Sequence, residues 1–321
     1  MRILVIGGSS FVGRHIVAAT LADGHQLTLF NRGRTDAEAF PHAEHLVGDR
    51  DHDLSALTGR FFDAVIDVCA YVPRQVRSLL EELGPRARHY TLISTISVYG
   101  QDVAPHGFTE DAGLLEPAWD ETFVPERYGE LKVACEIVAR ELVGERLLIV
   151  RPGFVVGPHD PTHRFTYWVE RVAAGEQIVA GDADQPLQVL DGRDLAALVS
   201  ALVGKGTVDV VHAAGPDPAP SFADILADVA TGVGAPAPIH WGGWRAELPL
   251  ASPEGWWPKM RADSTRACGY GLRWRPLPET ARDTLAWVRA ERAAGRYPEH
   301  PGVGLTAEQE RAALAEGRTA Q

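Results

Sequence analysis

The sequence predicts an α/β protein, a doubly wound parallel sheet with a smaller, interleaved lobe. Three observations predict it. Short apolar runs alternate with longer helical stretches through the first half of the chain. The first of these runs leads directly into a glycine-rich turn. The 321 residues, 45% of them hydrophobic, suffice for one large α/β domain and an added lobe.

The elements of the sheet follow in chain order. Continuous apolar runs predict strands, and 3.6-residue periodicity predicts helices between them. Because alternating strands and helices of this length form parallel sheets, helices are expected on both faces. The predicted strands are residues 2–6, 26–30, 64–68, 90–94 and 147–151, and the predicted helices include 11–21, 76–83 and 128–142.

The second half of the chain predicts an irregular lobe that is interleaved with the sheet. From Gly157 onward proline, histidine and aromatic residues are frequent, and four tryptophans fall between residues 241 and 257. Residues 188–202 and 208–213 again have strand and helix patterns that could rejoin the sheet. The predicted domains are therefore 1–156 with 188–216, and a lobe and tail of 157–187 with 217–321.

Charge and cysteine content restrict the function classes. The net charge of −12 argues against nucleic acid as a partner, because phosphate-backbone binding needs a basic surface. Three widely spaced cysteines give no disulfide framework, which fits a reducing compartment. The apolar start is too short for a signal peptide, and no run approaches a membrane span. We expect a cytoplasmic protein with no membrane partner.

A glycine-rich turn follows the first predicted strand and opens the first helix. In that context backbone N–H groups and the helix dipole can hold a pyrophosphate, as in Rossmann dinucleotide-binding folds. Ser10 stands where a middle glycine is usual. The predicted cofactor-binding residues of this turn are Gly7, Ser9, Ser10, Phe11, Val12 and Gly13.

The end of the second strand indicates which dinucleotide binds. An NAD site usually places a carboxylate there, but this chain has Asn31, Arg32 and Arg34. Since guanidinium groups can hold a 2′-phosphate, we predict NADP(H) as the preferred cofactor, with NAD(H) as the alternative. Further predicted cofactor contacts are Asp49, which could reach the adenine amine, Arg50, and Cys69 and Ala70, which follow the strand at residues 64–68.

A tyrosine–lysine pair is the best clue to the chemistry. Only three residues are lysines, and Lys132 follows Tyr128 by four positions. Chance would give on the order of 0.07 such pairs in this chain. The spacing places both side chains on one helix face, where an ammonium group can favour the phenolate.

With this pair, the glycine turn, the segment 94–100 and the segment 151–158, the chain resembles the short-chain dehydrogenase/reductase superfamily. It is most similar to the extended branch, which includes NAD-dependent epimerases and dehydratases. Segments 164–168 and 191–194 resemble an atypical subgroup, whose members are labelled epimerases, reductases or chloroplast stem-loop RNA-binding proteins.

The resemblance implies roles for individual residues. Tyr128 would be the general acid/base, Lys132 would hold the nicotinamide ribose and lower the tyrosine pKa, and Thr95 would orient the substrate carbonyl, with Ser94 as the fallback for Thr95. Pro152 and Val155 would flank the nicotinamide. The candidate substrate contacts are Tyr71, Ser97, Arg164 and Trp168.

One departure from the branch bears on the reaction. Sugar-nucleotide 4,6-dehydratases carry an Asp-Glu pair where this chain has Ile96 and Ser97, which argues against dehydration. We therefore predict an NADP(H)-dependent oxidoreductase that moves a hydride to or from a carbonyl or secondary alcohol of a small polar metabolite. The alternatives are a nucleotide-sugar epimerase with tightly bound cofactor, and a non-catalytic RNA-binding or cofactor-sensing protein.

Two further expectations concern metal and assembly. His159 and His163 are four residues apart, a spacing used for metals on helices, but Pro161 interrupts the helix and no third ligand is evident. We expect no metal. A homodimer is common in the branch that the chain resembles.

Overall fold

The computed structural model describes residues 1–33, 39–120, 122–297 and 302–319. Within these ranges the largest sheet has seven strands in the order β10-β6-β5-β4-β1-β2-β3, and each neighbouring pair is parallel. The strands are β1 (Arg2–Ile6), β2 (Gln26–Asn31), β3 (Glu44–Val47), β4 (Ala64–Asp67), β5 (Tyr90–Ile93), β6 (Leu147–Pro152) and β10 (Asp209–Ala213).

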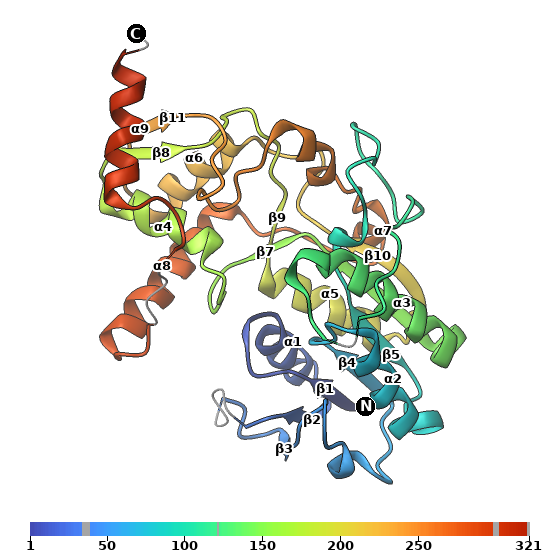
Figure 1. Cartoon of the computed structure of the whole chain (residues 1–321). Helices are drawn as coiled ribbons and strands as arrows, with labels where there is room; N and C mark the ends of the chain where they lie inside the picture. Colours follow the sequence, from blue (N-terminus) through green and yellow to red (C-terminus); the bar gives the residue numbers. More distant parts are fainter. Residues whose placement is uncertain (34–38, 121, 298–301, 320–321) are drawn as a thin grey trace.

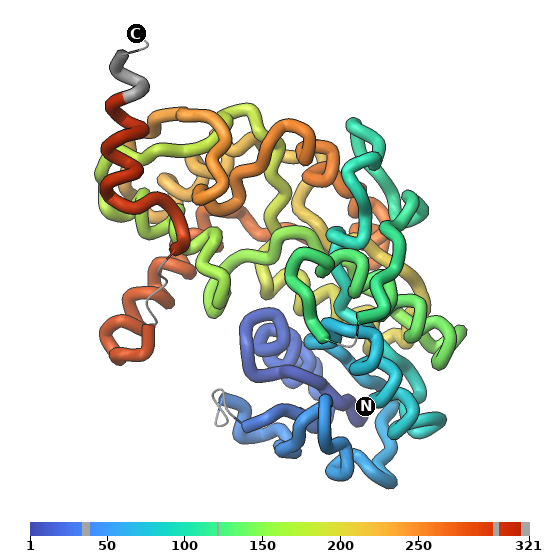
Figure 2. The backbone as a smooth tube through the Cα atoms, viewed as in Figure 1, coloured from blue at the N-terminus to red at the C-terminus, as the bar shows by residue number. Residues whose placement is uncertain are grey.

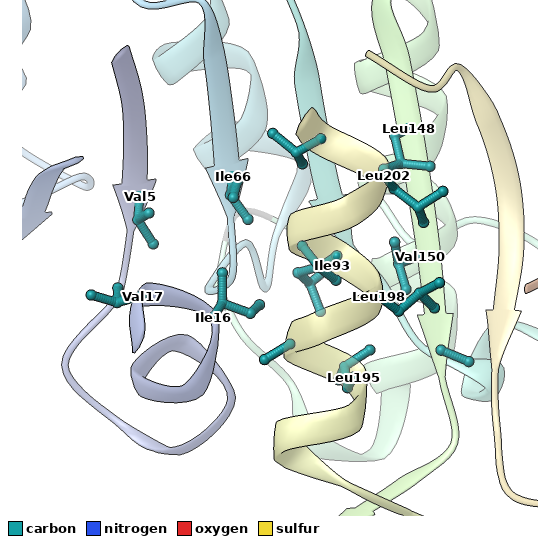
Figure 3. Close-up of a cluster of buried hydrophobic side chains, with 14 of the residues drawn as sticks. Val5, Ile16, Val17, Ile66, Ile93, Leu148, Val150, Leu195, Leu198 and Leu202 are labelled. Carbon is teal, nitrogen blue, oxygen red and sulfur yellow. The ribbon is translucent and has the colours of Figure 1, made fainter. Parts of the chain in front are cut away.

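Helices cover both faces of this sheet (Figure 1). One face is covered by α1 (Phe11–Ala22) and α5 (Gly192–Gly204), and the other by α2 (Pro73–Leu83) and α3 (Tyr128–Val143). In Figure 3, Leu195, Leu198 and Leu202 of α5 lie over β5 and β6, while Ile16 and Val17 lie beside β1 and β4. The doubly wound parallel sheet that the sequence predicts is confirmed.

The central strands are mainly apolar because both sides of the sheet are covered. All four residues of β4, from Ala64 to Asp67, are buried, and so are all six of β6. The predicted strands and helices agree with the observed ones to within a few residues at each end.

The lobe is built from two short strand pairs and several helices. Strand β7 (Phe154–Val156) pairs with β9 (Val189–Asp191), and β8 (Ile178–Ala180) pairs with β11 (Ile239–Trp241). The tryptophan-rich stretch also contains a 3-10 helix, Glu254–Met260. The helices of the lobe are α4 (Arg164–Ala174), α6 (Phe222–Val233), α8 (Leu277–Ala293) and α9 (Ala307–Thr319), whereas α7 (Thr265–Gly269) packs against β10 at the edge of the large sheet.

The chain passes between sheet and lobe more than once. After β7, α4 and β8 it returns through α5 and β10, and it enters the lobe again at α6 (Figure 2). The domain limits predicted above stay predictions. In the described ranges no helix is both long and apolar enough to cross a bilayer.

Candidate active site

Two adjoining cavities lie at the carboxyl ends of the sheet strands. The first is lined by the ends of β1 and β2 and by the residues after β3. The second, of about 440 Å³, extends from the glycine turn past the ends of β4, β5 and β6 to the lobe. Both are lined by Gly7, Ser10, Cys69 and Tyr71, so they form one continuous groove. The groove crosses the point where strand order reverses, next to β1, which is where doubly wound folds bind ligands.

The glycine turn has the close packing that a dinucleotide site needs. Gly7 has a φ of +88°, and a Cβ on it would lie 2.7 Å from Cys69 Sγ. A Cβ on Gly13 would lie 2.3 Å from the Gly7 carbonyl oxygen, so only glycine lets α1 approach β1 this closely. The exposed Ser10 is the N-cap of α1, and its hydroxyl makes no capping bond. The turn therefore leaves the start of α1 open toward the groove and fits a pyrophosphate.

The predicted residues of the turn line the groove. Ser9 borders the first cavity, while Phe11, Val12 and Gly13 border the second.

The end of β2 lies in the first cavity. Asn31 and the exposed Arg32 line it, and Asn31 Oδ1 accepts a hydrogen bond of 2.8 Å from Gly33 N. Asp49 lines the same cavity. Arg34, also predicted to bind the cofactor, lies outside the described residues.

Arg50 lies in the wall of the first cavity, where protein groups take up most of its donors. Its two terminal nitrogens donate to the Asp67 carboxylate at 2.7 and 2.8 Å, and one also reaches the Gln75 carbonyl at 3.0 Å. The Asp67 carboxylate raises the pKa of Arg50, although burial alone would lower it. Arg50 thus lines the cavity next to Asp49, with its terminal nitrogens bonded to the protein itself.

Thr95, Tyr128 and Lys132 all line the second cavity. Thr95 follows β5, and its hydroxyl accepts a hydrogen bond of 3.1 Å from Ser97 N. Tyr128 is the first residue of α3, and it lines the cavity together with residues at the ends of β5 and β6. The three residues come from two elements separated in sequence and meet in one cavity.

Lys132 is held by backbone carbonyls. Its side chain is almost fully buried, and Nζ donates to Ala70 O at 2.8 Å and to Ile93 O at 2.7 Å. An ammonium group has three donors, so one is left for another acceptor. Ala70, predicted as a cofactor contact, contributes this carbonyl and is not among the lining residues of either cavity.

The electrostatics of Tyr128 differ from the expectation that Lys132 lowers its pKa. Burial raises the pKa of the phenol above its ordinary value. A hydrogen bond with the Thr95 hydroxyl and the nearby Arg164 guanidinium act in the opposite direction. The cation that favours the phenolate is therefore Arg164 of the lobe, because the Lys132 ammonium is directed to two carbonyls.

Ser94, the alternative to Thr95, makes contacts in the core of the protein. Its hydroxyl donates to Glu136 Oε1 at 2.6 Å, and Glu136 also receives hydrogen bonds from Arg151 at 2.9 and 2.6 Å. All three side chains are buried. Thr95 thus stays the hydroxyl that faces Tyr128.

The other predicted contacts divide between cavity and core. Cys69, Pro152 and Val155 line the second cavity, and so do Tyr71, Ser97 and Arg164.

The prediction that Trp168 contacts substrate is wrong. Its side chain is fully buried in the lobe, packs edge-on against Phe222 at 5.1 Å, and donates to Pro249 O at 2.8 Å. It lies on the inward face of α4, where an aromatic residue fills the core.

The sequence did not indicate that the 3-10 helix of the lobe contributes to the second cavity. Its residues Trp256, Lys259 and Met260 line this cavity. They follow Tyr128 by more than a hundred positions, in a stretch without periodicity, so no pattern connects them to it. The available signal was the rarity of lysine in this chain.

The two histidines considered for metal binding face aromatic neighbours. The His159 ring packs at 5.3 Å from Trp287, and His163 Nδ1 lies 3.0 Å from the Tyr297 hydroxyl. Among the described residues no group of three or more potential ligands could hold a metal ion.

Comparison with known proteins gives the same fold. A chloroplast stem-loop binding protein of 41 kDa b from Arabidopsis thaliana is 28% identical over 221 residues, which are 63% of this chain and 55% of that protein. The chain therefore spans little more than half the length of this relative. Among solved structures, UDP-N-acetylglucosamine 4-epimerase from Bacillus cereus has a TM-score of 0.71 at 18% identity, covering 89% of this chain and 99% of its own.

UDP-glucose 4-epimerase from Thermotoga maritima, solved with UDP-glucose, has a TM-score of 0.69 at 16% identity over 90% of this chain and 99% of its own. UDP-glucuronic acid 4-epimerase from Bacillus cereus, solved with NAD, has a TM-score of 0.67 at 19% identity, covering 90% and 99%. The sequence model of one family matches residues 3–212, from β1 into β10. By this match the chain belongs to the NAD dependent epimerase/dehydratase family.

Proposed function

We propose that the protein is an NADP(H)-dependent oxidoreductase that transfers a hydride to or from a carbonyl or secondary alcohol of a small polar metabolite. The observation that carries the proposal is the meeting of Thr95, Tyr128 and Lys132 in a cavity continuous with the glycine turn. The cofactor, when bound, supplies or accepts the hydride.

The chain's own residues handle the proton and the developing charge. Reduction of a carbonyl produces an alkoxide, which needs a proton donor and a second hydrogen-bond donor. Tyr128, kept protonated by burial, is suited to donate the proton, and the neighbouring Thr95 hydroxyl can donate the second hydrogen bond. The remaining donor of Lys132 can hold a ribose hydroxyl of the cofactor.

Replacing Tyr128 tests the proposal. Tyr128→Phe keeps the ring and removes the proton donor, so hydride transfer from NADPH to a panel of keto acids and hydroxy ketones should fall by about 10²- to 10⁴-fold. NADPH absorbance measures it, and Tyr270→Phe, outside both cavities, is the matched control. Equal rates in wild type and Tyr128→Phe would refute the catalytic assignment.

The preference for NADP(H) rests on Arg32. It is exposed at the edge of the first cavity, and no carboxylate follows β2 at the position usual for an NAD site. Arg32→Gln should weaken NADPH binding by about tenfold, the loss expected of one charge-assisted bond, and leave NADH binding unchanged. Fluorescence titration with both nucleotides decides, and equal weakening of both would contradict the 2′-phosphate contact.

Epimerisation is the second candidate function, supported by the family match and by the epimerases that share the fold. Product formed without net change in NADPH would favour it over the reductase. An RNA-binding role has the Arabidopsis relative in its favour and the net charge of −12 against it.

A further inference from the structure

We infer that the substrate carries an oxyanion, a carboxylate or a phosphate, and that Arg164 and Lys259 bind it in the second cavity. The inference rests on the proposed function, since it takes this cavity as the substrate site. It goes further in naming the chemical class of the substrate and in adding Lys259, a residue that the sequence did not single out.

The charges lining the cavity are all of one sign. Its described lining includes Lys132, Arg164 and Lys259, and it includes no aspartate, glutamate or histidine. The chain as a whole has 43 acidic residues against 31 basic ones, so an all-cationic lining runs against its composition. Lys132 is held by two carbonyls, which leaves the two cations of the lobe to face a ligand.

Lys259 is half-buried and has an aromatic neighbour in place of an anion. Its Nζ lies 5.0 Å from the centre of the Trp256 ring. Burial lowers the pKa of its ammonium group, and the more distant Glu130 acts in the opposite direction. Among the described residues no carboxylate lies within the 4.0 Å of an ion pair with Lys259.

Arg164 is oriented by neutral groups. Its Nε donates to Thr162 Oγ1 at 3.1 Å, and its guanidinium stacks over the Phe154 ring at 5.0 Å. Within the described ranges its two terminal nitrogens have no protein acceptor. Other arginines of the lobe and its junction differ, since Arg193 and Arg275 each bind aspartate at 2.7 Å. The free fork of Arg164 matches the two oxygens of a carboxylate or phosphate.

The position of Arg164 places the bound anion next to the reacting centre. The guanidinium is close enough to Tyr128 to act on its phenol. A neutral substrate would leave two partly desolvated cations of the same cavity lining without a counter-charge, which is unfavourable. An anionic group held by both would compensate them and fix the neighbouring carbon near Tyr128.

The experiment is calorimetric titration of the protein saturated with NADP⁺, using inorganic phosphate and malonate as probes and malonamide as the neutral counterpart. Saturation with cofactor prevents phosphate from occupying the glycine turn. We expect phosphate or malonate to bind and malonamide not to bind. Arg164→Gln and Lys259→Gln should each weaken anion binding by about tenfold or more, as expected for a charge-assisted bond.

Matched controls separate binding from folding. Arg164→Lys should retain most of the binding, and the exposed Arg282→Gln and Lys205→Gln should retain all of it. Melting temperatures should stay at the wild-type value in each variant. Binding of phosphate alone or malonate alone would identify which oxyanion the site takes.

The inference is overturned if neither anion binds, if malonamide binds equally well, or if both glutamine variants bind as the wild type does. Its failure is distinct from failure of the proposed function. If Tyr128→Phe loses hydride transfer while the wild-type protein binds neither anion, only the proposed substrate class is rejected. If the wild-type protein transfers no hydride but binds the anion, and both glutamine variants lose this binding, the reductase function is rejected and the anion site is retained.

Discussion

At the scale of single residues, burial in the cavity favours the protonated form of Tyr128. Burial raises the pKa of the phenol, so near neutral pH it is an acid, as carbonyl reduction requires. In the oxidation direction the same group has to lose its proton first. The rate of oxidation should therefore rise with pH until the pKa of Tyr128 is reached.

Arg164→Gln should move this dependence to higher pH. The guanidinium favours the phenolate, so its removal raises the pKa of Tyr128 further, and the alkaline rise in the oxidation rate shifts upward. The pH profile of kcat for alcohol oxidation measures the shift, and Arg164→Lys should restore the original profile. A profile that does not move would show that Arg164 has no effect on Tyr128.

Single residues also show what the sequence can and cannot predict. Thr95, Tyr128 and Lys132 were predictable because each stands in a motif at a fixed distance from an element end. Lys259 and Trp256 were not, because a 3-10 helix in the lobe brings them to the cavity and tertiary packing alone sets their place. Trp168 was misjudged because an aromatic on an amphipathic helix can face either core or cavity.

At the scale of elements, α3 is joined to the ends of β5 and β6 by buried ions. Glu136 lies one turn after Lys132, and its carboxylate binds Ser94 and Arg151. Burial raises the pKa of Glu136, but the Arg151 guanidinium outweighs it, and the net pKa lies below the ordinary 4.5. The Glu136–Arg151 pair therefore holds the helix that carries Tyr128 against β6, and the bond from Ser94 holds it against the segment between β5 and Thr95.

Glu136→Gln should be strongly destabilising, by about 3–5 kcal/mol, since it leaves Arg151 buried without its counter-charge. Urea unfolding at pH 7 measures the loss of stability. The control is Glu141→Gln on the same helix, which removes an exposed ion pair with Arg77 and should cost about 0.5 kcal/mol or less. Equal losses in the two variants would contradict the role of Glu136.

The same pair makes an acid-dependent contribution to folding. The folded pKa of Glu136 is depressed, so its contribution is complete above the unfolded value and is lost as pH falls through the folded one. Wild-type stability should decrease below about pH 4.5, and the Glu136→Gln variant should have a smaller decrease.

At the scale of the whole molecule, sheet and lobe are joined by ion pairs near α5. Asp194 accepts hydrogen bonds from Arg275 N, Nε and Nη2 at 2.9, 2.9 and 2.7 Å. Thr280 of α8 donates to Asp191 at 2.8 Å, just before α5. These bonds connect α5, which packs on the sheet, to Arg275 and to the start of α8.

Asp194→Asn should lower the free energy of unfolding by about 1–3 kcal/mol, because the Arg275 guanidinium loses its closest carboxylate. Thermal unfolding measures it, and Asp228→Asn, exposed on α6, is the matched control. No difference between these variants would mean that the junction contributes little to stability.

The fold class was predictable at this scale because the alternation of strands and helices covers much of the chain, and β10 was expected to rejoin the sheet. The limits of the lobe were harder to predict, since its short strands pair over long sequence distances, as β8 does with β11.

The order of the elements along the chain has a consequence for how new specificities can arise. Because α5 and β10, which belong to the sheet, lie between α4 and α6 in sequence, no single stretch of the gene encodes the lobe. Recombination cannot exchange it as a cassette without also exchanging part of the sheet. Substrate range in this architecture changes by substitution at a few positions, and Arg164 and Lys259 are where we expect such changes to accumulate.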